Sequence, residues 1–160
     1  MPDLPPDMLR RGRDPDQDFS DEELLFLRFR GDQYSSDTGI GLEAIRVPDL
    51  SVNREKHGGR PEYLLVNRDH LLARHRVWGV SEFRVGDIPR ELNHQGEYYT
   101  FRPVHDPKAH NYFHTEVQCF DSGQQHICAA DRFPHDVGMR WRKRLRFKMR
   151  ISIDPKPLDV

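Results

Sequence analysis

The most constraining feature of this 160-residue sequence is a strict alternation near its C-terminus, from Met139 to Ile153. Apolar residues occupy every odd position of this segment except Lys143. The even positions from 140 to 150 are all basic: Arg140, Arg142, Arg144, Arg146, Lys148 and Arg150. A period of two is typical of a β-strand, whose successive side chains point to opposite faces. We therefore expect a long C-terminal strand, bent near Lys143, with a row of cations on one face.

Shorter segments upstream predict the rest of one α+β domain. Apolar or alternating runs bounded by turn residues predict strands at residues 50–52, 80–85, 98–104, 113–120 and 126–130, and a strand or a short helix at 24–29. Pro61 suits the first position of a helix, and a leucine stripe extends it to about His75. We expect a single, mainly antiparallel sheet of about five or six strands with this one principal helix packed on one face.

The expected domain covers residues 20–160 and follows a disordered or extended, proline-rich arm at residues 1–19. The residues expected to fill its core are Leu64, Leu65, Leu71, Leu72, Val80, Phe83, Val117, Leu145, Phe147, Met149 and Ile151.

Composition narrows the class of protein. No apolar run approaches the ~20 residues of a transmembrane helix, and the acidic, proline-rich N-terminus is unlike a signal peptide. Two cysteines, Cys119 and Cys128, are too few for a disulfide scaffold, so both are expected to be thiols. We therefore expect a soluble, cytoplasmic protein that does not contact a membrane.

The basic segment suggests a first function. The net charge is only −1, but seven basic residues and no acidic residue lie between Met139 and Arg150, which leaves 18 basic against 26 acidic residues elsewhere. On a strand these cations would repeat every ~7 Å, close to the phosphate repeat of a nucleic acid. The pattern predicts a binding module or accessory subunit that engages a polyanion, foremost a nucleic acid. An acidic partner protein, or a solvated or internally paired outer strand, would suit the same face.

A second cluster lies at residues 105–119 and contains His105, His110, His114 and Glu116. On a strand, His114 and Glu116 share one face. The two side chains, with a loop histidine, suit a metal site, acid–base catalysis or hydrogen bonding to a nucleotide, while His114 would also suit a turn in which it bonds to a backbone carbonyl. The spacing matches no metal motif, so we assign neither a metal ion nor a cofactor. The alternative function is an enzyme that acts on a nucleotide or nucleic acid through these four catalytic candidates.

A cationic loop precedes the expected helix. Arg54, Lys56, His57 and Arg60 surround two glycines just before Pro61. Backbone N–H groups at a helix N-terminus attract anions, so we include these four residues as candidate ligand-binding residues. The glycine spacing is not that of a phosphate loop, and a flexible surface loop would have the same composition.

One further arrangement connects distant segments. Arg28 lies in an apolar segment, Ser51 opens the string Ser-Val-Asn-Arg, and Glu116 lies on a later expected strand. This order resembles the layout of ADP-ribosyltransferases. The resemblance implies that Arg28 helps to bind NAD, Ser51 orients the pocket and Glu116 activates the nucleophile. It covers only these three residues, because the surroundings of Glu116 differ from the family's usual loop and its second strand signature is missing.

Overall fold

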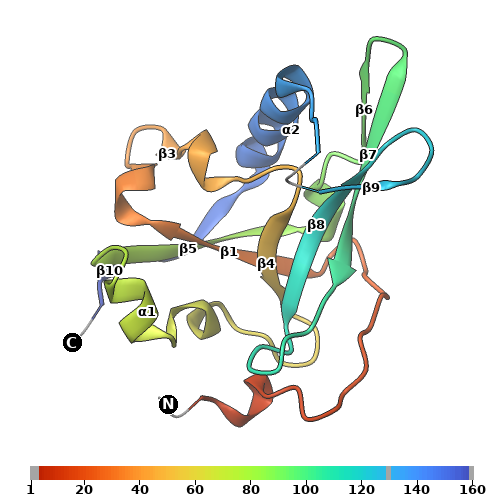
Figure 1. The fold of residues 1–160 in the computed structure, drawn as a ribbon. Helices are drawn as coiled ribbons and strands as arrows, with labels where there is room; N and C mark the ends of the chain where they lie inside the picture. The colour runs from red at the N-terminus through yellow and green to blue at the C-terminus, as the bar shows by residue number, and fades with distance from the viewer. Residues whose placement is uncertain (1–3, 129–130, 159–160) are drawn as a thin grey trace.

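The computed structural model describes residues 4–128 and 131–158, which form an antiparallel sheet with one main helix on one face (Figure 1). The strand order is β10-β5-β1-β4-β8-β7-β6, and β9 pairs with β8. This confirms the predicted α+β class. The strands are β1 (Leu24–Arg30), β4 (Leu50–Arg54), β5 (Val77–Arg84), β6 (Glu91–His94), β7 (Glu97–His105), β8 (His114–Phe120), β9 (His126–Ile127) and β10 (Arg150–Pro157), with a separate hairpin of β2 (Tyr34–Ser35) and β3 (Gly39–Ile40).

The C-terminal segment differs from the expectation. Residues His135–Lys148 form the helix α2, and a strand begins only at Arg150, so the predicted continuous strand is wrong. The reason is that a pattern with a period of two residues also repeats every four residues, and a four-residue repeat fits one face of a helix. Val137, Trp141 and Leu145 follow this repeat and are buried. Successive even positions are about 200° apart around a helix, so the basic residues do not form one row.

The helical geometry also corrects the predicted core at Phe147, which is 86% exposed. It lies two residues beyond Leu145, on the opposite side of α2. Lys143, where the alternation fails, lies one turn before Phe147 on the same outer side and is exposed. Most other predicted core residues are buried, whereas Leu64, Leu72, Met149 and Ile151 are half-buried.

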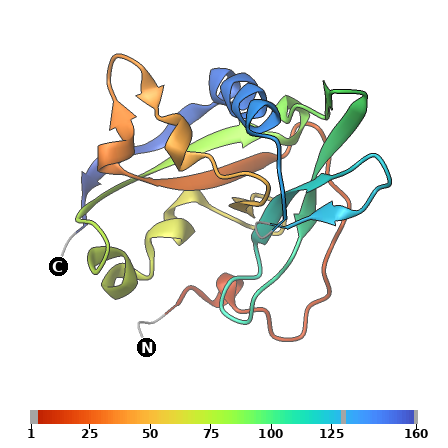
Figure 2. The ribbon, with the colours of Figure 1, turned by 45° about the horizontal axis from the view of Figure 1, so that its top comes forward.

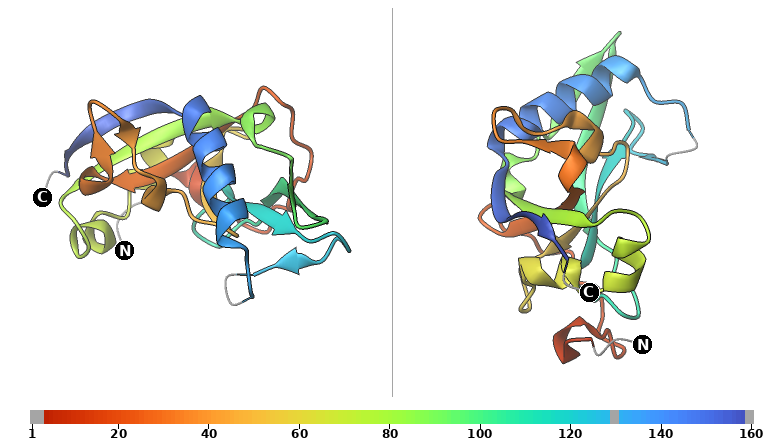
Figure 3. Two further views of the ribbon diagram at one scale, coloured as in Figure 1. Left: turned by 90° about the horizontal axis from the view of Figure 1, so that it is seen from above. Right: turned by 90° about the vertical axis from the view of Figure 1, so that its left-hand side faces the viewer.

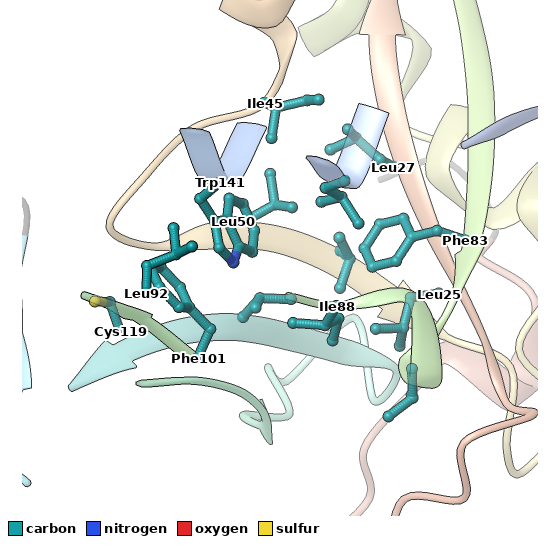
Figure 4. Close-up of a cluster of buried hydrophobic side chains, with 14 of the residues drawn as sticks. Leu25, Leu27, Ile45, Leu50, Phe83, Ile88, Leu92, Phe101, Cys119 and Trp141 are labelled. Carbon is teal, nitrogen blue, oxygen red and sulfur yellow. The ribbon is translucent and has the colours of Figure 1, made fainter. Parts of the chain in front are cut away.

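The core between α2 and the sheet is continuous (Figure 4). Trp141 stacks on Phe101 of β7 with ring centroids 4.9 Å apart, and its indole N–H donates a hydrogen bond to the Pro89 carbonyl. Leu25 and Phe83 extend the same cluster along β1 and β5. At the N-terminal end of α2, Asp136 forms an ion pair with Arg140 one turn later, which favours the helix. No helix among the described residues is long and apolar enough to cross a membrane.

The second face of the sheet is covered only in part (Figures 2 and 3). The helix predicted from Pro61 to about His75 is two short pieces, a 3₁₀ helix at Pro61–Leu65 and α1 at Arg68–Leu72. The helix is interrupted at Asn67, whose backbone is not helical. The leucine stripe still packs as expected, because Leu65 and Leu71 join Trp78 in a second apolar cluster.

The N-terminal arm lies extended against the body of the protein (Figure 1). Met8 is buried with Tyr112 and Phe113, and the Tyr112 N–H donates to the Met8 carbonyl. The arm therefore packs beside the N-terminal end of β8.

The centre of the sheet is opened by a separation between two neighbouring strands. β1 and β4 pair only through Leu25 with Arg54 and through Phe26 with Asn53. Beyond these pairs the strands diverge, as Figure 1 shows. The wedge between them is the position of the largest polar cavity described below.

Candidate functional site

A cavity of about 600 Å³ occupies the wedge between β1 and β4. Its size falls within the range of small-molecule sites. Residues from β1, β4, β5 and β8 line it together with the segments after β3 and α1, and they include Leu27, Arg28, Arg30, Glu43, Arg46, Leu50, Ser51, Asn53, Arg74, Trp78, Asn111 and His114.

Four arginines line this cavity, namely Arg28, Arg30, Arg46 and Arg74, and one of them, Arg30, is paired with Asp32 at 3.1 Å. Burial lowers the pKa of Arg28, and the nearby positive charge of Arg74 acts in the same direction. Arg28 donates to the Leu64 carbonyl and lies over the Trp78 ring, and no carboxylate of the described residues forms an ion pair with it. Glu43 is the one acidic residue among the described lining residues. The cavity therefore carries excess positive charge and favours an anion.

Asn53 adds an unpaired donor to the cavity wall. The Phe113 N–H donates to Asn111 Oδ1, which leaves Asn111 Nδ2 to donate to Asn53 Oδ1 at 2.7 Å. This chain fixes the orientation of the Asn53 amide. Its Nδ2 is buried and has no hydrogen-bond partner among the described residues, and the whole residue is 1% exposed. A buried unpaired donor costs about 1–3 kcal/mol, which an acceptor atom of a ligand would recover.

His114 lines the cavity, and Glu116 and Asp106 lie close to it. The His114 Nδ1–H donates to the Asp106 carbonyl at 3.0 Å, so Nε2 is the nitrogen left with a lone pair. Gln118 Nε2 donates to Glu116 Oε2 at 3.3 Å. The Lys108 ammonium lies 2.8 Å from Asp106 Oδ2 and lowers the pKa of that carboxyl. The sequence pointed to His114 and Glu116, but it gave no reason to choose Asp106.

The other two catalytic candidates lie elsewhere. His105 is buried, accepts a hydrogen bond from the Asp16 N–H at Nδ1 and donates from Nε2 to the Tyr112 carbonyl. Both ring nitrogens are therefore occupied, Nδ1 by the N-terminal arm and Nε2 by the loop before β8. His110 is exposed and lines a separate cavity of about 340 Å³ with Met8 and Tyr63.

The cationic loop mostly contacts the N-terminal arm. Arg54, expected to bind an outside anion, is 0% exposed because its guanidinium is bonded to Glu23 and to the carbonyls of the arm. Lys56 and His57 both contact the carboxylate of Asp16 at 2.8 Å. Arg60 is exposed and precedes the 3₁₀ helix. Arg54, Lys56 and His57 thus bind carboxylates, but these carboxylates belong to this chain.

The basic residues of α2 are distributed around the helix. Arg140 is bound to Asp136, whereas Lys143, Arg144 and Lys148 are exposed and form no ion pair within the described part of the chain. These three surround the exposed Phe147 on the outer side of α2. Arg142 and Arg146 are half-buried, and Arg150 is exposed at the start of β10.

The three residues of the ADP-ribosyltransferase-like arrangement lie on consecutive strands. Arg28 is on β1, Ser51 on β4 and Glu116 on β8, in the order β1-β4-β8. Ser51 and Glu116 are direct cross-strand partners, and Ser51 and Arg28 both line the cavity. Residues separated by almost ninety positions in sequence therefore lie on one face of three consecutive strands.

Comparisons with known proteins assign no family. No family model matches the chain, and neither the curated proteins nor the solved structures include a match. Any function must therefore be inferred from the geometry of the site itself.

Acid is expected to destabilise this protein, beginning at mildly acidic pH. Burial lowers the pKa of His105, so the folded chain binds fewer protons there than the unfolded chain does. The free energy of unfolding should therefore fall as the pH decreases below about 6.5, the unfolded value. The Asp16 carboxyl, whose pKa is lowered mainly by Lys56, adds a second loss below about pH 3.9.

Urea unfolding at a series of pH values would measure this effect. His105→Gln should flatten the dependence near neutral pH, whereas the exposed-loop variant His110→Gln should keep it. A stability that stays constant between neutral pH and about pH 5 would contradict the assignment of His105 as a buried neutral histidine.

Proposed function

We propose that this protein is an enzyme that binds a phosphate-bearing small molecule of the nucleotide class in the cavity between β1 and β4. The observation that carries the proposal is that four arginines and the asparagine with the unpaired amide, Asn53, line one cavity. Arginine matches phosphate oxygens in bidentate geometry, and the apolar wall at Leu27 and Leu50 suits the remainder of a nucleotide.

His114 and Glu116 would supply the reactive end of the site. His114 lines the cavity, and its Nε2 keeps a lone pair because Nδ1 is bonded to a backbone carbonyl. Among nucleotides, NAD is the first to test, since the adjacency of Ser51 and Glu116 beside Arg28 matches what the resemblance implies. The two free cysteines support a reducing, cytoplasmic location as part of this proposal.

Calorimetric titration with ADP and NAD tests the proposal, with adenosine as the ligand that lacks phosphate. Arg28→Gln and Arg74→Gln should each weaken ADP binding at least tenfold, since a charge-assisted hydrogen bond contributes about 1.5–3 kcal/mol. Arg76→Gln is the matched control, because Arg76 is exposed and lies two residues from Arg74 without lining the cavity. Equal affinity for adenosine, or no effect of either cavity variant, would contradict the proposal.

A second candidate function concerns the outer side of α2. An aromatic ring among unpaired cations is the combination that binds single-stranded nucleic acid by stacking and phosphate contacts. Phe147 with Lys143, Arg144 and Lys148 provides it. This candidate keeps the expected polyanion partner but replaces the expected strand by a helix, and an acidic partner protein is the competing occupant of the same surface.

A further inference from the structure

We propose that Asp106, His114 and Glu116 bind a divalent transition-metal ion at the edge of the cavity. One potential ligand atom from each residue lies within 4.8 Å of the other two. Ligand atoms around one ion are about 3–3.5 Å apart when each bond is about 2.0–2.2 Å long. Small rotations of the partly exposed side chains therefore suffice to bring the three onto one ion.

The backbone already holds the three positions together. His114 and Glu116 are two residues apart on β8 and point to the same face. Asp106 follows β7, and its N–H donates to the His114 carbonyl at 2.9 Å. The loop and the strand are thus joined at the level of the proposed ligands.

Each proposed ligand also has a second contact that orients it. The Asp106 carbonyl accepts from His114 Nδ1, which lies 3.9 Å from Asp106 Oδ2 and leaves Nε2 as the nitrogen to bind an ion, and Gln118 donates to one oxygen of Glu116. Metal-binding histidines characteristically donate their other N–H to a carbonyl or carboxylate in this manner. Lys108 occupies Asp106 Oδ2, but this lysine is largely exposed and can be displaced by an ion.

A separate observation points to a ligand at the same place. Asn53, whose buried Nδ2 has no partner among the described residues, is the direct cross-strand neighbour of His114. An N–H donor cannot bind a cation, so it calls for an acceptor oxygen next to the histidine. A metal-bound anion would satisfy both groups, since three protein ligands leave open coordination positions.

The ligand set favours Zn²⁺ or Mn²⁺ over Mg²⁺. One imidazole and two carboxylates suit borderline transition metals, whereas Mg²⁺ prefers oxygen ligands alone. The role of the ion in catalysis rests on the proposed function, but its binding does not. The ion would contact the phosphate-bearing ligand, so that His114 and Glu116 would serve the reactive end of the site through the ion.

Titration of the chelator-treated full-length chain with ZnCl₂, followed by calorimetry, tests the site. His114→Ala and Asp106→Asn should each weaken the tightest Zn²⁺ binding at least tenfold. His110→Ala is the control, because His110 is an exposed loop histidine that is not part of the cluster. Lys108→Gln should strengthen binding, since it removes the cation that competes for Asp106.

The proposal is overturned if His110→Ala loses Zn²⁺ binding while His114→Ala and Asp106→Asn retain it. It is also overturned if neither Lys108→Gln nor Asp106→Asn changes the affinity for Zn²⁺. The ring signals of His114 in NMR spectra should broaden first when MnCl₂ is added. ADP titration in the presence of chelator separates the two claims, because cavity binding that persists without metal leaves the proposed function standing when the metal site fails.

Discussion

Replacing Arg54 by methionine is expected to lower the free energy of unfolding by about 3–5 kcal/mol, because it leaves a buried carboxylate without its partner. Arg54 is fully buried, and its guanidinium donates to both carboxylate oxygens of Glu23 at 2.8 and 2.9 Å. It also donates to the carbonyls of Asp16 and Asp18. One side chain thus joins β4, the start of β1 and the N-terminal arm.

Urea unfolding monitored by tryptophan fluorescence measures this loss. Lys56→Met is the matched control, because Lys56 contacts the same arm from a more exposed position and its loss should lower the free energy of unfolding far less. The double variant Glu23→Leu, Arg54→Met should be more stable than Arg54→Met alone, since it removes the stranded charge. A loss below about 1 kcal/mol in Arg54→Met would show that this ion pair does not hold the arm.

Trp141→Ala is expected to destabilise the protein by about 3–5 kcal/mol, while Phe147→Ala should change the free energy of unfolding by no more than about 0.5 kcal/mol. Trp141 is fully buried against Phe101, whereas Phe147 is almost fully exposed. The two positions are both odd, so a strand would place them on the same face. Only a helix gives one large and one negligible effect.

Thermal and urea unfolding of both variants provide the measurement. Similar losses in the free energy of unfolding at both positions would contradict the helix and support the strand that the alternation alone predicts. Leu145→Ala should resemble Trp141→Ala in direction, because Leu145 follows one turn later on the buried side.

The sheet could be predicted because its strands carry their own signal. The strands β4, β5, β7 and β8 each follow a short alternating or apolar run bounded by turn residues, and the structure places strands at those segments. The prediction for the C-terminal segment failed because its alternation over many residues fits both the two-residue period of a strand and a four-residue repeat on one face of a helix. The residues that distinguish them are Lys143, which breaks the pattern, and the Asp136–Arg140 pair one helical turn apart.

The candidate site was only partly predictable, for a different reason. His114 and Glu116 are two residues apart on one strand, so their shared face follows from spacing. Arg28 and Ser51 lie on other strands, and only the strand order and register bring them to a common face. Arg46, Arg74 and Asp106 come from loops or from the end of a short helix, and tertiary packing alone brings them to the cavity.

Arg54 and His105 are residue types that are common in functional sites, but here their buried side chains bond to other residues of this chain. Their partners, Glu23 and the backbone of the arm, are thirty or more residues away in sequence. The polar residue types alone therefore could not separate an internal anion from an external ligand.

The central claim is that an anionic ligand binds in the wedge between β1 and β4. Chemical-shift mapping of the isotopically labelled full chain during titration with ADP tests it most directly. Saturable shifts are expected at the Asn53 side-chain amide, the Arg28 guanidinium and the His114 ring. Shifts confined to Lys143, Arg144 and Phe147 on α2, or none in any of these groups at millimolar ADP, would contradict it.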